Sequence, residues 1–196
     1  MKNNLTKEQI KILEILSNGS DLMFQQLSSG PMEHINRIVA LHHKTEPVLQ
    51  DLEKRGIKMN SLGDMTHSTF NEEVYKKSIP ILLEWLKKES LPYEVKELII
   101  DGLIQRTISK KYAFGIIIDI YKTIDPNYRD EWGYRTGLST VIGNAFLRWT
   151  DDDHAEIIFG LLSDKKFRDD SWVLRSVANF KTPKNVKEAT KLLLQE

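Results

Sequence analysis

The sequence contains no cysteine among its 196 residues. Disulfide bonds, thiolate nucleophiles and cysteine-based zinc sites are therefore excluded. No apolar run reaches the roughly 18 residues that a membrane-spanning helix needs, and the first residues lack the apolar stretch of a signal peptide. We expect a cytoplasmic protein that does not enter a membrane.

An excess of charge of one sign is also lacking. Lysine plus arginine and aspartate plus glutamate each number 28, so the formal net charge at pH 7 is zero. Nucleic-acid binding is disfavoured, because it would require a local basic patch. The sequence has no glycine-rich phosphate loop, and no spacing of serine, histidine and aspartate indicates a catalytic triad. These absences favour a non-enzymatic protein without a cofactor or a bound metal ion.

The residues that are present predict an all-α fold. Hydrophobic residues make up 40% of the chain and charged residues 29%, a balance that supports a buried core. The segment FGIIIDIY, residues 114–121, has the β-branched content of a strand. A single strand among helices would have no partner, so we expect a buried helix there.

Residues 1–70 predict an irregular helical N-terminal cap. A capping-box pair opens a first helix, a short amphipathic segment follows, and Pro31 starts another helix. Pro47 is expected to break this helix and restart it, and Gly56 should end the helical turns. The rest of the cap lacks clear periodicity, which indicates a loop or short turns.

Residues 71–196 carry helical signals in pairs, and we expect one structural unit there. The predicted pairs are 74–86 with 95–103, 112–124 with 132–149, and 154–162 with 172–180, followed by a last helix from Pro183. Short polar stretches separate the two helices of each pair. The pattern predicts three helical hairpins.

A short motif recurs in the second helix of each pair. The segments YEVKELI, WGYRTGL and WVLRSVA align on Lys96, Arg135 and Arg175, which are spaced by 39 and 40 residues. An aromatic residue lies three positions before each cation. A period near 40 that is built from two helices is typical of an α-solenoid.

Residues 72–196 resemble the HEAT-repeat family, in particular bacterial proteins with degenerate HEAT-like repeats. The resemblance rests on the paired helices, on Pro80 inside the first helix of a pair, on VIGNAF at 141–146, and on Asp169 six residues before Arg175. It implies a short α–α superhelix, a HEAT-like solenoid, in which the second helices form a concave face.

The three repeated cations have two interpretations. Each could extend its alkyl chain along the seam between helices, with the charged end bonded to an acid, as Arg175 would be to Asp169. Alternatively, Lys96, Arg135 and Arg175 could point outward as a ladder that receives an acidic segment or phosphates. We favour the structural interpretation.

The functional hypothesis is a protein–protein interaction or scaffold module that binds a protein or peptide partner. The residues expected to contact that partner are polar and lie in the predicted second helices: Lys96, Glu97, Arg135, Thr136, Asn144, Arg175 and Ser176. Asn144 is included because a polar side chain on an otherwise apolar helix requires a hydrogen-bond partner, which a neighbouring helix or a ligand could supply.

Two other clusters could carry chemistry. His34 lies eight positions before the pair His42-His43, which puts His34 and His42 near one helix face, but no acid lies at matched spacing beside them and all three are expected to be solvated surface histidines. The segment DDDHAE, residues 151–156, groups carboxylates beside a histidine, as metal binding or acid–base catalysis requires. At a predicted helix start, such acids more often cap free amides, and we favour that interpretation.

Nucleic-acid binding is the alternative function. Tyr93, Trp132 and Trp172 could stack on bases, although aromatic residues in a stacked helix more often pack between repeats. HEAT-like alkylpurine DNA glycosylases hold damaged DNA on a face lined with tryptophans and an aspartate, and Trp132, Trp149 and Trp172 lie in the corresponding half of the chain. The zero net charge argues against such base-excision activity.

Overall fold

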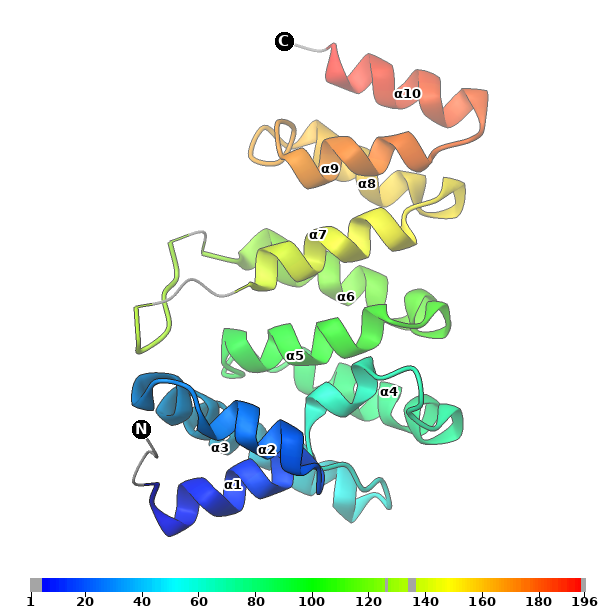
Figure 1. Ribbon diagram of the computed structural model, residues 1–196. Helices are drawn as coiled ribbons and strands as arrows, with labels where there is room; N and C mark the ends of the chain where they lie inside the picture. Colours follow the sequence, from blue (N-terminus) through cyan, green and yellow to red (C-terminus); the bar gives the residue numbers. More distant parts are fainter. Residues whose placement is uncertain (1–4, 126, 134–136, 195–196) are drawn as a thin grey trace. The chain divides into compact units, whose positions relative to one another are not determined.

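The computed structural model describes residues 5–125, 127–133 and 137–194. These residues form ten α-helices and four short 3-10 helices, with no β-strand in the described ranges, so the described chain is all-α (Figure 1). Contacts group the chain into two units: unit 1 comprises residues 1–102 and 129–136, and unit 2 comprises residues 103–128 and 137–196. The boundary between the units falls near the end of a helix, whereas the sequence placed a boundary at residue 70.

Unit 1 contains five α-helices and one 3-10 helix. Their bounds are α1 Lys7–Ser17, α2 Asp21–Ser28, α3 Met32–Lys54, η1 Leu62–Thr66, α4 Glu72–Leu86 and α5 Tyr93–Ile104, of which the last two residues belong to unit 2. The predicted capping box opens α1, because Thr6 accepts from the Gln9 amide while the Gln9 side chain accepts from the Thr6 amide. The expected loop at 57–70 contains η1, which Ser61 caps.

The helix α3 is continuous, so the predicted break at Pro47 is wrong. Proline removes one backbone hydrogen bond from a helix interior, a cost that packing must offset. Val48 and Leu52, which both follow the proline in the helix, are fully buried and anchor this half of α3. The helix ends before Gly56, whose φ of 79° lies in the left-handed region, as expected of a terminating glycine.

Unit 2 contains two helical hairpins and a final helix. Its elements are η2 Thr107–Ser109, α6 Lys110–Thr123, α7 Leu138–Trp149, η3 Asp152–His154, α8 Ala155–Ser163, α9 Ser171–Ser176, η4 Val177–Asn179 and α10 Pro183–Leu193. The segment 114–121 lies within α6, which confirms the predicted buried helix. The helix predicted from Trp132 is too long, because Gly133 has a φ of 79° and α7 begins only at Leu138.

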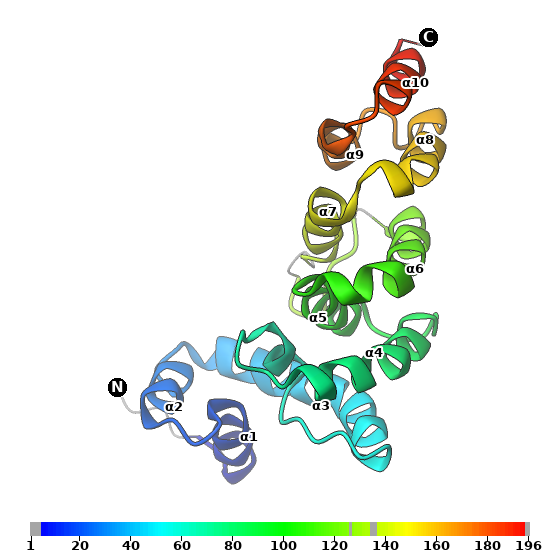
Figure 2. The same ribbon diagram turned by 90° about the vertical axis from the view of Figure 1, so that its right-hand side faces the viewer.

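The helices of unit 2 form two rows, which Figure 2 shows side by side. The α6–α8–α10 row contains the first helix of each hairpin and the final helix, and the α7–α9 row contains the second helices. Aromatic rings connect the two rows inside the unit: Phe146 of α7 lies 6.2 Å from Phe114 and 4.9 Å from Tyr121 of α6, both edge to face. Trp149, the last residue of α7, is fully buried against Phe114.

Within each row the helices run parallel. The start of α6 meets the start of α8, since the rings of Phe114 and His154 are 5.2 Å apart. Beyond their other ends, Lys166 donates to the carbonyl of Lys122 at 2.8 Å. In the α7–α9 row, Trp172 lies against Gly143, and Asn179 donates to the Leu147 carbonyl at 2.9 Å. The α8–α9 hairpin therefore stacks on the α6–α7 hairpin in the same orientation.

Candidate functional site

The predicted partner-binding residues lie in different surroundings. Lys96 and Glu97 are on α5, and Asn144, Arg175 and Ser176 are in the α7–α9 row of unit 2. Asn144 and Arg175 are exposed and Glu97 is half-buried, whereas Lys96 and Ser176 are buried. Arg135 and Thr136 lie outside the described residues. Of the seven, the structure thus presents Asn144 and Arg175 together on one exposed surface.

Lys96 is only 7% exposed. Its ammonium lies 5.5 Å from the centre of the Tyr93 ring, one helical turn earlier. Burial lowers the pKa of Lys96, and the nearby Glu89 carboxylate offsets this only in part. This placement resembles the predicted structural role along a helix seam, but no described acid forms an ion pair with Lys96. It is not accessible as a partner contact.

Ser176 is also inaccessible to a partner. Its side chain is completely buried, and its hydroxyl donates to the carbonyl of Val173 at 2.7 Å. This hydrogen bond within the helix satisfies the buried hydroxyl. The expectation that Ser176 faces a partner is therefore wrong, because the inward side of α9 places it in the core.

Arg175 forms no ion pair with Asp169 or with any other acid of the described ranges, which contradicts the predicted structural pair. Its guanidinium lies over the ring of Trp172, 5.6 Å from the centroid. The acid that caps the start of α9 is Asp170, whose carboxylate accepts hydrogen bonds from the amides of Trp172 and Val173 at 2.8 and 3.3 Å. Burial and the neighbouring Asp170 carboxylate raise the pKa of Tyr121.

The outward surface of α7 and α9 is the candidate site. We call it the α7–α9 face and define it by five exposed residues: Asn144, Leu147, Arg148, Leu174 and Arg175. Because the helices are parallel and Trp172 meets Gly143 while Asn179 meets Leu147, the segment 174–175 lies beside 144–147. The five side chains therefore share one surface of unit 2.

Sequence reasoning missed three members of the α7–α9 face, Leu147, Arg148 and Leu174. Neither leucine was singled out from the sequence, and they are 36% and 38% exposed. Arg148 donates to the carbonyl of Ile104 and to the side-chain oxygen of Gln105, both at 3.3 Å. A signal was present, because both leucines directly precede an arginine and so fall at the edge of the apolar stripe.

Gly143 fixes the spacing of α7 and α9. A Cβ atom at this position would lie 2.2 Å from Cδ2 of Trp172, far closer than side chains approach each other. The absence of a side chain lets the indole rest directly on the backbone of α7. This contact holds Trp172, and with it Arg175, at a defined position on the face.

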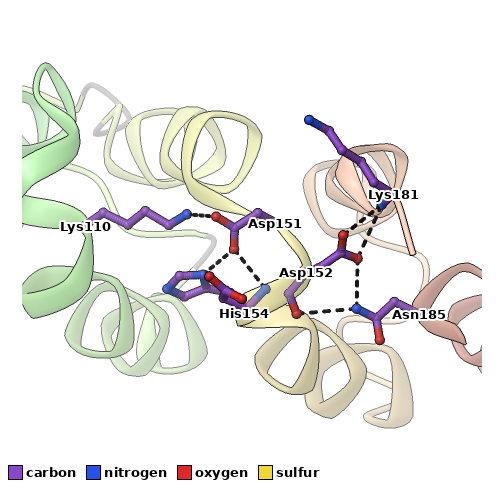
Figure 3. Close-up of polar contacts among 7 residues, drawn as sticks. Lys110, Asp151, Asp152, His154, Lys181 and Asn185 are labelled. Atoms are coloured by element: carbon purple, nitrogen blue, oxygen red, sulfur yellow. Dashed lines mark hydrogen bonds and ion pairs between the residues drawn. The ribbon is translucent and has the colours of Figure 1, made fainter. Parts of the chain in front are cut away.

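The acidic segment at 151–156 joins three helices of the α6–α8–α10 row (Figure 3). Asp151 forms an ion pair with Lys110 at the start of α6, and its other carboxylate oxygen lies 2.6 Å from Nδ1 of His154. Burial alone would raise the pKa of Asp151, but the hydrogen bonds from Lys110 and His154 outweigh it and lower the pKa. Asp151 thus connects α6 to the start of α8.

Asp152 makes the matching connection to α10. Its carboxylate accepts from the backbone amides of Lys181 and Thr182, from the Thr182 hydroxyl at 3.0 Å, and from Asn185 at 2.8 Å. Figure 3 shows Asp152 turned toward Lys181 and Asn185, away from Lys110. Partial desolvation alone would raise the pKa of Asp152, but these hydrogen bonds outweigh it and lower the pKa. The carboxylates of Asp151 and Asp152 both accept hydrogen bonds at helix starts, in agreement with the capping interpretation.

The histidines of α3 are separated rather than gathered. His42 is buried, so the expectation of a surface histidine is wrong for it, and desolvation lowers its pKa against the opposing effect of Glu46. The ring nitrogens of His43 lie 3.2 and 3.4 Å from carboxylate oxygens of Glu8 and Glu46. His34 lines an open hollow of about 220 Å³ with Pro31, Glu33 and Arg37.

The described ranges contain no group of three histidine or acidic side chains arranged to hold a metal ion. Nor does any helix in these ranges combine the length and hydrophobicity needed to cross a membrane. Comparisons with protein-family models, curated proteins and solved structures found no match to this chain. The geometry of the chain itself is therefore the basis for a functional proposal.

Proposed function

We propose that this protein is a non-enzymatic interaction module, a HEAT-like α-solenoid that presents its second helices to a protein or peptide partner. The parallel stacking of the α6–α7 and α8–α9 hairpins supports this proposal, because stacked hairpins with a common orientation are the unit from which solenoids are built.

The exposed α7–α9 face is the observation that carries the proposal. Leu147 and Leu174 contribute apolar area, and Asn144, Arg148 and Arg175 surround it with hydrogen-bonding groups. A mixture of exposed apolar residues with arginine at the margin is typical of protein-binding surfaces. In contrast, the carboxylates of Asp151 and Asp152 are bonded to His154, Lys110 and the start of α10.

The proposal is tested with a double variant, Leu147→Ser with Leu174→Ser, used as bait in affinity capture beside the wild-type chain. The matched control is Val186→Ser with Leu193→Ser, which removes similarly exposed apolar residues from α10. We expect the first variant to lose a partner that the wild type and the control retain, with all three equally helical by circular dichroism. Retention of every partner by the first variant would contradict the proposal.

A nucleic-acid-binding role has less support. Trp149 is fully buried, and the ring of Trp172 rests on Gly143 with Arg175 near it, so of the three tryptophans named for this role only Trp132, at 37% exposed, is an exposed indole among the described residues. Titration with single- and double-stranded DNA at low salt decides this alternative. Salt-sensitive binding that the Leu147→Ser and Leu174→Ser changes leave intact would favour it.

We also propose a cytoplasmic location, which the lack of cysteine supports because reducing compartments make no use of disulfides. Fractionation of cells that express the full chain tests this. Recovery in the cytosolic fraction is expected, and recovery in an exported fraction would overturn it.

A further inference from the structure

The α7–α9 face is cationic in a chain whose net charge is zero. Residues 138–149 and 171–179, which form α7, α9 and η4, contain two arginines and no acidic residue. Both arginines, Arg148 and Arg175, are members of the face. A surface with cations and no acids repels basic partners and attracts acidic ones.

Neither arginine is neutralised by an acid of the described chain. Arg148 donates only to the neutral oxygens of Ile104 and Gln105, and Arg175 contacts the ring of Trp172. Both guanidinium groups therefore keep donors for a carboxylate, which an arginine can bind through two parallel hydrogen bonds. This distinguishes them from Arg55 and Arg37, which already form ion pairs at 2.9 and 3.1 Å.

Arg175 is also held in position before a ligand arrives. The indole of Trp172 rests on Gly143, and the guanidinium lies over that indole. Stacking restricts the flexible arginine side chain, so less conformational entropy is lost when a carboxylate binds. An exposed cation without such support would contribute less.

The leucines determine what else the ligand must carry. Leu147 and Leu174 directly precede the two arginines in sequence and are each more than one third exposed. A ligand that only supplied charge would leave this apolar area in water. Aliphatic side chains placed among acids would satisfy both features of the face.

We propose that the α7–α9 face binds an acidic peptide segment with interspersed leucine-like side chains, whose carboxylates bond to Arg148 and Arg175 while its aliphatic groups cover Leu147 and Leu174. This inference rests on the proposed interaction function and specifies the chemistry of the partner. A peptide is favoured over a nucleic acid because the leucines offer nothing to a phosphate, and Trp172 already contacts Gly143 and Arg175.

Fluorescence anisotropy with two labelled peptides tests the proposal on the full chain. The acidic probe has the sequence DEELDDLLDE, and the matched probe NQQLNNLLNQ replaces each acid by its amide. We expect the acidic probe to bind and the amide probe to bind at least about tenfold more weakly. Binding of the acidic probe should weaken as salt is added, because exposed charge pairs are screened.

Variants locate the binding. Arg148→Gln and Arg175→Gln should each weaken the acidic probe by about tenfold, and Lys184→Gln should not, although it removes the same charge from an exposed position on α10. Leu174→Ser should weaken both probes alike. Equal binding of the acidic probe by the wild type and Arg175→Gln, or no binding of either probe, would overturn the proposal.

The result also separates this inference from the proposed function. If the amide probe binds as tightly as the acidic one and Leu174→Ser weakens both, the face binds peptides but does not select acids, and only the present inference fails. If a single-stranded oligonucleotide displaces the acidic probe and Arg175→Gln abolishes its binding, the ligand is a nucleic acid and both proposals fail.

Discussion

Different interactions connect the helices within each of the two rows of unit 2. In the α6–α8–α10 row, the carboxylates of Asp151 and Asp152 bond to Lys110 on one side and to the start of α10 on the other. In the α7–α9 row, the indole of Trp172 rests on Gly143, and Asn179 donates a hydrogen bond to the Leu147 carbonyl. The acids of the first row are used in holding the stack, while the arginines of the second remain available.

This difference indicates which polar side chains can bind a ligand in a chain that has no catalytic motif. Polar groups that satisfy helix termini cannot also bind a ligand without loosening the stack. Arg148 and Arg175 cap no helix terminus and form no ion pair with a described acid, so they keep hydrogen-bond donors for a ligand. The comparison therefore predicts large effects on stability from changes in the contacts within the rows, and large effects on binding from changes in the α7–α9 face.

The largest effect on stability within these rows is expected from Gly143→Ala. The added methyl group would overlap the indole of Trp172, a rigid double ring that cannot withdraw as a flexible side chain could. Overpacking of this kind typically costs about 1–3 kcal/mol. The free energy of unfolding from urea titration measures it, and a variant as stable as the wild type would show that Trp172 does not rest on Gly143.

Asp152→Ala should also destabilise unit 2, because it removes the acceptor for the amides of Lys181 and Thr182 and for the Asn185 side chain. The neighbour Asp153 provides a matched control, since the structure gives its carboxylate no hydrogen bond among the described residues. We expect a lower thermal midpoint for Asp152→Ala and an unchanged one for Asp153→Ala. Equal midpoints for the two variants would contradict the capping role.

The stability difference between the wild type and Asp152→Ala should depend on pH. Against the effect of partial desolvation, the hydrogen bonds lower the pKa of Asp152 in the folded state, so the carboxylate stabilises the fold at pH values above its unfolded pKa, which is about 4. As the pH falls below this value toward the depressed folded pKa, the contribution is lost and the two proteins should converge. Urea titrations at a series of acidic pH values would reveal a constant difference if the carboxylate charge were irrelevant.

Gly160→Ala should raise the stability of the fold, whereas Gly143→Ala should lower it. Gly160 lies inside α8, and a Cβ there would meet no atom within 4 Å. Alanine favours a helix over glycine by about 0.5–1 kcal/mol, so the variant should be more stable than the wild type by that amount. Gly115→Ala in α6 has equally open surroundings and should behave alike. Destabilisation by either change would mean that other atoms pack against these glycines and that the space beside them is not open.

Sequence periodicity predicted most helices because it depends on local spacing. The predicted last helix matches α10, and the buried helix at 114–121 lies within α6. The break at Pro47 failed because periodicity does not measure how strongly Val48 and Leu52 are packed. Helix existence is thus a local property, while its continuity depends on tertiary contacts.

The candidate site was predictable only in part. Asn144 and Arg175 were selected as polar residues of second helices, and both are exposed. The pairing of Arg175 with Asp169 was wrong because spacing along the chain cannot reveal that the guanidinium lies over Trp172. The exposure of Leu147 and Leu174 was missed, since an apolar residue counts as core until its neighbours are known.

The smallest expected effect on stability is that of Arg175→Gln. Its guanidinium is exposed and in no ion pair among the described residues, so the loss is limited to a surface contact with Trp172, and the free energy of unfolding should change by no more than about 0.5–1 kcal/mol. Urea titration of this variant beside Gly143→Ala measures the contrast directly. A loss as large as that of Gly143→Ala would make Arg175 part of the structural framework, and the distinction between the two rows would then fail, because both would depend on their charged residues for stability.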